Sequence, residues 1–211
     1  MNISVYQLKV TFLTPVLGTQ PQKDVASEYL GEKVGVRADE LETLPELLEK
    51  GTTVFHRLPD THEPLYYDFH VLGLLKEAGQ AFNGKEGLPK NLRSKVATYA
   101  FVRPRRIMLR LPDGAPLNGE YEERPLRAQT QQGPRTALAR SEKLPEGTSF
   151  TCEVGLLPSD VTEKVLRELL DYGIVKGFGQ WRGGGWGRFT YELTPDGEMP
   201  LSEWGKALVA V

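Results

Sequence analysis

The residues best suited to chemistry in this chain lie in one glycine-rich stretch, from Gly177 to Phe189. Glycine permits positive φ angles and lets another molecule approach the backbone N–H groups closely. Arginine offers a forked set of donors that suits phosphate, and tryptophan offers a flat face for stacking. We interpret the stretch as a loop that holds a polyanion, most simply single-stranded nucleic acid; a plain tight connection with a core tryptophan is the alternative. The binding residues would be Gly177, Gly179, Trp181, Arg182, Gly183, Gly184, Gly185, Trp186 and Arg188.

Positive charge gathers in the middle of the chain, although the formal net charge is only −2. From Lys23 to Glu63 there are ten acidic and five basic residues, whereas from Lys90 to Arg140 there are eleven basic and four acidic ones. A basic segment is the usual electrostatic footprint of a phosphate backbone. It could equally pair with the acidic segment. Within it, an alternating run predicts a strand over Ala100–Leu111 whose basic face carries Arg103, Arg105, Arg106 and Arg110.

Histidine is the other residue type that could do chemistry on RNA. Cleavage without metal requires a base for the 2′-OH and an acid for the leaving oxygen. His56 and His62 fall in one predicted loop and could converge there, whereas His70 is expected to be structural in the first turn of a helix. No carboxylates stand at metal-ligand spacing, and no Cys–His pattern accompanies Cys152. The sequence therefore predicts neither a metal nor a cofactor.

The elements that would position these residues follow from hydrophobic periodicity and turn signals. They alternate as strand, helix, two strands, helix and strand, which is the α+β ferredoxin-like (RRM-like) βαββαβ arrangement with a four-stranded antiparallel sheet. We expect one domain over residues 1–211, with a long insertion at residues 18–66 that includes an acidic helix at Asp39–Lys50. The predicted core elements are Val5–Phe12, Asp68–Phe82, Ala100–Leu111, Thr148–Leu156, Ser159–Tyr172 and Trp186–Leu193.

A protruding β-hairpin is predicted between the second and third core strands. Two weakly alternating polar runs, Leu126–Gln131 and Thr136–Arg140, flank a Gly133-Pro134 turn. The hairpin as a whole covers residues 124–141 and has little apolar surface to bury. An ordinary surface hairpin and a ligand-binding one fit this pattern equally well.

The sequence contains no run long enough to cross a membrane, and its start does not resemble a signal peptide. A single cysteine fits a reducing compartment. We therefore expect a cytoplasmic protein that does not bind a membrane.

Three segments together resemble the RAMP superfamily of CRISPR-associated RNA-binding proteins. The run Tyr172–Phe189 is similar to its pattern of glycines followed by Gly-aromatic-Gly-Arg before the last strand, here Gly185 to Arg188. Tyr67–Ala78 resembles the entry to its first helix, and Thr14–Gly18 resembles the close of its opening strand. The chain departs from the family where Gly183 and Gly184 replace a serine, and where Asp68 and His70 replace small hydroxyl residues. It also resembles phage and prophage proteins in Leu17-Gly18-Thr19 and in Gln132-Gly133-Pro134-Arg135.

This resemblance implies a scaffold that binds single-stranded RNA through the sheet and the glycine-rich loop. It implies partners that are copies of this chain or other RAMP-type subunits. In backbone-forming members an inserted hairpin, the thumb, wedges between bases, and here Arg127 to Arg140 would be that hairpin. Its RNA-contacting side chains would be Arg127, Gln129, Gln131, Gln132, Arg135 and Arg140.

Three functions remain open from the sequence. The first is a non-catalytic RNA-binding subunit of a ribonucleoprotein assembly, or a phage-encoded relative of one. The second is a metal-independent endoribonuclease that uses His56 or His62, as one branch of the superfamily uses histidine. The third is a phage protein that blocks a host defence complex, with Asp39–Lys50 as the contact.

Overall fold

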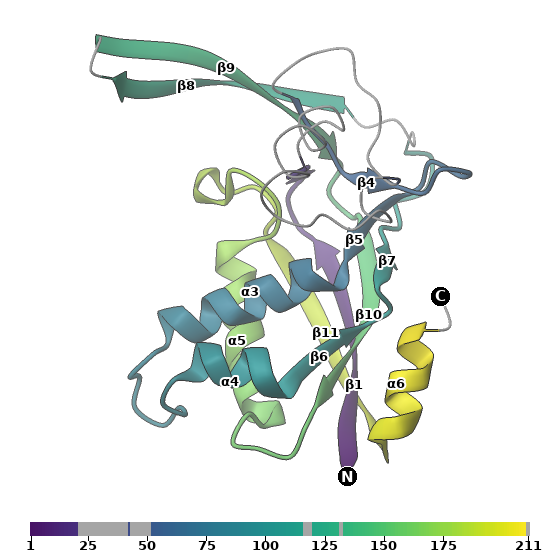
Figure 1. Cartoon of the computed structure of the whole chain (residues 1–211). Coiled ribbons are helices and arrows are strands. Elements are labelled where there is room, and N and C mark those ends of the chain that lie inside the picture. Colours follow the sequence, from purple (N-terminus) through teal and green to yellow (C-terminus); the bar gives the residue numbers. More distant parts are fainter. Residues whose placement is uncertain (21–41, 43–51, 116–119, 131–132, 210–211) are drawn as a thin grey trace.

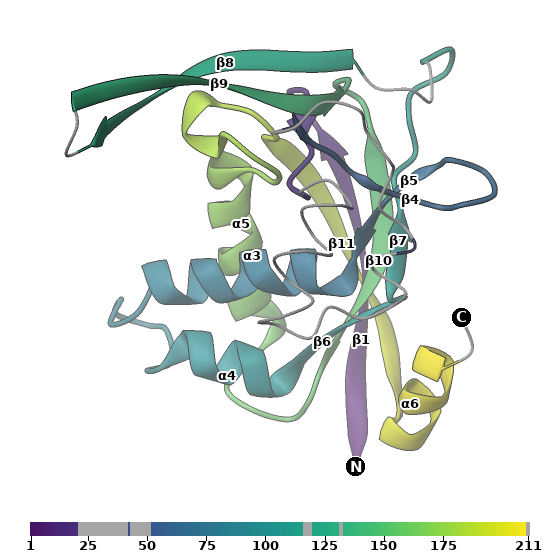
Figure 2. The same ribbon diagram turned by 45° about the horizontal axis from the view of Figure 1, so that its top comes forward.

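The computed structural model describes residues 1–20, 42, 52–115, 120–130 and 133–209. Its centre is an antiparallel four-stranded sheet in the order β11-β1-β10-β6. Two helices lie together on one face of this sheet (Figures 1 and 2). The chain order β1-α3-β6-β10-α5-β11 is ferredoxin-like, which confirms the predicted α+β fold. The elements are β1 (Asn2–Phe12), α3 (Asp68–Ala81), β6 (Ala100–Arg103), β10 (Ser149–Leu156), α5 (Glu163–Lys176) and β11 (Phe189–Pro200).

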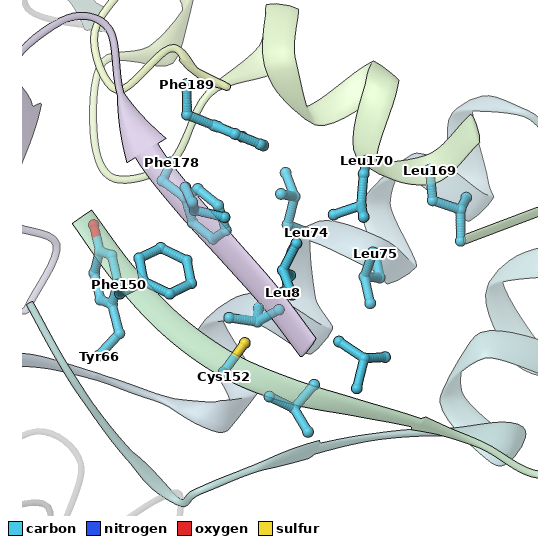
Figure 3. Close-up of a cluster of buried hydrophobic side chains, with 14 of the residues drawn as sticks. Leu8, Tyr66, Leu74, Leu75, Phe150, Cys152, Leu169, Leu170, Phe178 and Phe189 are labelled. Atoms are coloured by element: carbon cyan, nitrogen blue, oxygen red, sulfur yellow. The ribbon is translucent and has the colours of Figure 1, made fainter. Parts of the chain in front are cut away.

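The main core fills the space between the sheet and the two helices (Figure 3). Alternation along a strand sends every second side chain to the same face, so β1 buries Leu8, Val10 and Phe12 towards the helices. Phe178 reaches this core from the glycine-rich loop, with its ring centre 5.2 Å from that of Phe189. The loop is therefore fixed to the core at its first aromatic residue.

A short C-terminal helix covers part of the opposite face of the sheet. This helix, α6 (Leu201–Val209), follows β11 directly and lies across the sheet from α3 and α5 (Figure 1). Its Trp204 is buried against Ile3 and Val5, which β1 presents on this opposite face of the sheet. This helix was not predicted from the sequence.

The predicted strand Ala100–Leu111 is wrong as a single element. Pro104 has no backbone N–H to donate, and β6 ends at Arg103. The chain then enters a separate sheet of order β4-β5-β7, made of β4 (His56–Arg57), β5 (Pro64–Tyr67) and β7 (Arg106–Met108). The predicted basic strand face is consequently split between two sheets.

Helix boundaries differ from the prediction in physically simple ways. A further helix, α4 (Leu92–Tyr99), was not among the predicted core elements and packs beside α3. Helix α5 starts at Glu163 and continues past Gly173, which was expected to follow its end. Gly173 is instead a contact point, because a Cβ there would lie 2.8 Å from the ring of Phe189.

The predicted hairpin is present and long. Strands β8 (Glu120–Thr130) and β9 (Gly133–Leu144) pair with each other and project beyond the central sheet, on the side where α3 and α5 lie (Figures 1 and 2). Within the described ranges, the inner end of β9 is the one part of the hairpin that pairs with further strands, β2 (Val16–Leu17) and β3 (Thr52–Thr53). Most of the predicted helix at 39–50 lies outside the described residues. No helix in the described parts of the chain has the length and apolar character needed to cross a bilayer.

Candidate nucleic-acid interface

The glycine-rich loop closes on itself, and two of its glycines serve that closure. The N–H of Phe178 donates to the carbonyl of Gly187 over 2.9 Å, which joins the two ends of the loop. Gly177 and Gly187 have φ angles of 80° and 70°. A Cβ on Gly177 would lie 2.6 Å from the carbonyl oxygen of Trp186, and a Cβ on Gly187 would lie 2.0 Å from the carbonyl oxygen of Phe178. These glycines are required by the fold of the loop itself.

The loop is also fastened to the segment that follows β1. The N–H of Gly187 donates to the carbonyl of Pro15, and the N–H of Gln180 donates to that of Leu17. Thr14 Oγ1 donates to the carbonyl of Gly185 over 3.0 Å. A Cβ on Gly179 would lie 2.4 Å from the Leu17 oxygen. Two of the segments that carried the family resemblance are therefore in direct contact.

The tip of the loop is the part open to another molecule. Trp181 is 42% exposed and stacks on Trp186, with 6.0 Å between ring centres and 17° between planes. A 3₁₀ turn follows over Arg182–Gly184. A Cβ on Gly183 would meet no atom within 4 Å. Among the sequence-predicted glycines, Gly183 thus offers the most unobstructed backbone.

The two arginines of the loop have different surroundings. Arg182 Nη1 donates to Glu77 Oε2 on α3 over 2.7 Å, and Lys176 Nζ lies 3.2 Å from Glu77 Oε1. Burial alone would raise the pKa of Glu77, but the hydrogen bonds from Arg182 and Lys176 outweigh it and hold that pKa below its ordinary value. Arg188 is exposed and forms no ion pair within the described part of the chain. Glu77 therefore ties Arg182 to α3, whereas Arg188 is open to solvent.

The hairpin rests on the glycine-rich loop through residues that sequence reasoning missed. The guanidinium carbon of Arg124, on β8, lies 4.7 Å from the ring centre of Trp181. Its Nη2 donates to Gln180 Oε1 over 3.1 Å. The same oxygen accepts from Ser141 Oγ on β9 at 3.3 Å. Gln180 thus joins both hairpin strands to the loop through contacts that span 56 and 39 residues of sequence and that no local pattern signals.

A buried ion pair holds the base of the hairpin. The carboxylate of Glu142 accepts from Arg57 Nη2 of β4 through Oε1 and from the Phe55 N–H through Oε2, the latter over 2.9 Å. Arg57 Nη1 donates to the His62 carbonyl over 2.6 Å. Because every partner is hydrogen-bonded, this pair can stay buried. It fixes β9 against the β4–β5 hairpin.

The other predicted cations of the hairpin are only partly described. The guanidinium carbon of Arg140 lies 4.3 Å from the ring centre of Tyr121, and its Nε is 3.7 Å from Glu123 Oε1. The side chains of Arg127, Gln129 and Arg135, together with the whole of Gln131 and Gln132, lie outside the described residues.

The arginines after α4 serve contacts within the chain. Arg103 Nε donates to Glu153 Oε2 over 2.6 Å, and its guanidinium covers Trp204 at 3.9 Å on the α6 face of the sheet. Arg105 Nη1 pairs with Asp68 Oδ1 at the start of α3 over 3.1 Å. Arg106 lies in β7 opposite Tyr67. Arg103 and Arg106 lie in different sheets with Arg105 in the bend between them, so the three do not form the continuous basic face expected from the sequence.

The histidines occupy unlike environments. His56 is 2% exposed in β4, with its ring edge-on to that of Tyr67 at 4.7 Å. His62 is exposed in the turn between β4 and β5. His70 Nδ1 accepts from the Tyr67 N–H, and burial lowers the pKa of His70 to about 4. The described residues contain no cluster of three or more metal-ligating side chains.

No protein-family model and no curated protein sequence matches this chain. Solved structures do. One similar chain comes from a cryo-EM structure of the type III-B Cmr-beta complex bound to cognate target RNA, with a TM-score of 0.51 and 10% identity over 92% of this chain. This chain spans 61% of the length of that one. A second comes from a type IV-B CRISPR complex, with a TM-score of 0.46, 14% identity and 90% of each chain covered. The protein shares its fold with a subunit of the type III-B complex.

Proposed function

We propose that this protein binds single-stranded RNA without cleaving it, as a RAMP-type subunit of a ribonucleoprotein assembly. The observation that carries the proposal is the docking of the β8–β9 hairpin on the glycine-rich loop through Arg124, Gln180 and Trp181. This contact joins the hairpin and the glycine-rich loop, both candidates for RNA binding in the sequence analysis, into one surface. The shared fold with a chain of an RNA-bound complex supports it.

The chemistry of this surface suits an unpaired strand. Trp181 and Trp186 present aromatic area on which bases of any sequence can stack. Arg182 and Arg188 offer donors for phosphates, and Gly183 leaves room for a backbone to approach. With a net charge of −2, attraction to RNA must come from this local group of cations rather than from the whole molecule.

The histidines do not favour the nuclease alternative. Cleavage by paired acid and base groups needs both within reach of one phosphodiester. His56 is buried against Tyr67, whereas His62 is exposed in the adjoining turn. The third function, a phage protein that blocks a host defence complex, rests on the segment 39–50, which is mostly outside the described residues.

A binding assay with labelled single-stranded RNA tests the proposal. The purified protein is titrated at several salt concentrations, without metal, and the RNA is then analysed for breaks. We expect saturable binding that weakens with salt, and intact RNA. Absence of binding contradicts the proposed function, and metal-independent cleavage abolished by His62→Ala favours the nuclease instead.

A further inference from the structure

Arg124 has an unusual hydrogen-bonding state for a partly buried arginine. Its Nη2 donates to Gln180, but its Nε and Nη1 are shielded from solvent and have no hydrogen-bond partner among the residues that the structure describes. No carboxylate pairs with it among the described residues. The pKa of Arg124 is lowered by burial, which acts against its charge. The described part of the chain therefore supplies neither an anion for this charge nor an acceptor for two of the three guanidinium nitrogens.

Such an arrangement costs stability in the RNA-free protein. Burying a cation without an anion is unfavourable, and a shielded N–H without an acceptor adds to the cost. Three other shielded or half-buried arginines each pair with a carboxylate: Arg57 with Glu142, Arg103 with Glu153, and Arg182 with Glu77. Arg124 has no such carboxylate among the described residues, and it lies where the hairpin contacts the glycine-rich loop. Unfavourable groups of this kind are typically retained where function needs them.

We propose that Arg124 binds a backbone phosphate at the junction between the hairpin and the glycine-rich loop. The inference rests on the proposed RNA binding and names the residue that anchors the strand there. A phosphate supplies the missing anion and accepts from several guanidinium donors at once. The Trp181 ring under the guanidinium and the hydrogen bond to Gln180 hold Arg124 against the loop. Neutral bases alone would leave the charge uncompensated.

Access to this site requires a small movement of the hairpin. Because Nε and Nη1 are shielded in the free chain, the base of β8 must shift against the loop before a phosphate can reach them. Gln180 and Trp181 contact Arg124 directly, so the shift changes the surroundings of the Trp181 indole. Binding should therefore alter tryptophan fluorescence in the wild type.

Substitution of Arg124 gives a result that a purely structural arginine would not. Arg124→Met keeps much of the side-chain volume over Trp181 but removes the charge and the unsatisfied donors. We expect its melting temperature to stay the same or rise, because replacing a buried ionic group by an apolar one is often neutral or stabilising. We expect its RNA affinity to fall about tenfold or more, the scale of one charged hydrogen-bonded contact. The slope of log affinity against log salt should lose about 0.7, one phosphate contact on a single strand.

Two further variants complete the test. Arg124→Lys retains a cation and should keep more affinity than Arg124→Met. Arg93→Met removes an exposed arginine of α4 and should change neither affinity nor salt slope beyond a small general effect. Full RNA affinity in Arg124→Met overturns the proposal. A large fall in the melting temperature of this variant also overturns it, because it would show that Arg124 serves to hold the hairpin on the loop. If the wild type does not bind RNA, the proposed function is overturned as well. Failure of the Arg124 proposal can thus be distinguished from failure of the proposed function.

Discussion

At the scale of single residues, the hydroxyl of Tyr66 is the clearest unsatisfied group in the core. Tyr66 is buried beside Phe178 and Phe150, and its hydroxyl has no hydrogen-bond partner in the described structure. Burial strongly raises the pKa of this phenol, so it stays neutral. We expect Tyr66→Phe to leave the free energy of unfolding unchanged or raise it by about 1 kcal/mol, because a desolvated donor is removed with little change of shape. Urea denaturation measures this, and a clear loss of stability would mean that the hydroxyl has a partner.

The two loop arginines should separate affinity from stability. We expect Arg188→Ala to weaken RNA binding at unchanged stability, because Arg188 is exposed. Arg182→Ala should weaken binding too but cost up to about 1 kcal/mol of stability, since the partly exposed pair with Glu77 is lost. Lys85→Ala, which breaks a similar pair with Glu168, controls for loss of a surface ion pair. RNA titration and thermal melting measure both effects; unchanged affinity in the double variant would remove the loop from the binding site.

Residue types alone could not assign these roles. The sequence identified the loop by its glycines, but it could not tell that Gly177 and Gly187 close the loop whereas Gly183 stays open. It also grouped Arg103 and Arg105 with binding residues, because charge is visible in a sequence and the partner, Glu153 or Asp68, is not. Arg124 was missed because its defining contacts, with Gln180 and Trp181, come from a distant part of the chain.

At the scale of elements, two glycines of the same loop provide a matched pair. We expect Gly187→Ala to destabilise the protein by about 1–3 kcal/mol, because a Cβ would enter a positive-φ position against the Phe178 carbonyl. Gly183→Ala should be neutral for stability, since its Cβ meets no atom within 4 Å. Chemical denaturation of both variants measures the difference. Equal costs would contradict the loop conformation.

The hairpin should be divided into a firm base and a looser outer part. Residues near Ser141 and Glu142 also pair with β3 and with buried partners, whereas the outer strands pair only with each other. Backbone held by a single neighbouring strand opens more readily. We expect hydrogen exchange in the free protein to be slow at the base and fast from Arg127 to Arg135. Uniformly strong protection would favour a purely structural hairpin.

Shortening the hairpin tests its role directly. Replacing residues 129–136 by a Gly-Ser turn should leave folding intact, because the Arg57–Glu142 pair and the β2 and β3 contacts remain. RNA affinity or assembly along RNA should decrease. Thermal melting and RNA titration of the shortened protein measure both, and full affinity together with full assembly would argue against a thumb.

At the scale of the whole molecule, the sequence predicted the order of the core elements and the hairpin, because periodicity and turn signals are local. It could not predict α6. The buried side chain of that helix, Trp204, is explained only by Ile3, Val5 and Gly155 on the far face of the sheet. Likewise, β2 to β5 are strands of two to four residues, too short for any period to mark.

The position of α6 bears on which side of the molecule RNA would meet. RNA-recognition domains of the same topology stack bases on aromatic residues of the open sheet face. Here α6 covers the apolar part of this face, where Trp204 packs against Ile3, Val5 and Phe101 and lies under the guanidinium of Arg103. The residues of this face beyond that cluster are polar or charged. They include Gln7, Lys9, Thr11, Thr151, Thr190 and Thr194. The aromatic surface lies instead at the loop, in Trp181 and Trp186.

A matched pair of charge insertions decides between the two sides. Gly183→Glu places a carboxylate at the open tip of the glycine-rich loop, and Thr151→Glu places one on the exposed sheet face. Both positions are exposed, so both variants should fold. We expect Gly183→Glu to lower RNA affinity severalfold, more at low salt than at high salt, because a like charge would stand beside the phosphates. Thr151→Glu should bind as the wild type does. If Thr151→Glu weakens binding and Gly183→Glu does not, the strand crosses the sheet rather than the loop, and the hairpin–loop surface is not its site.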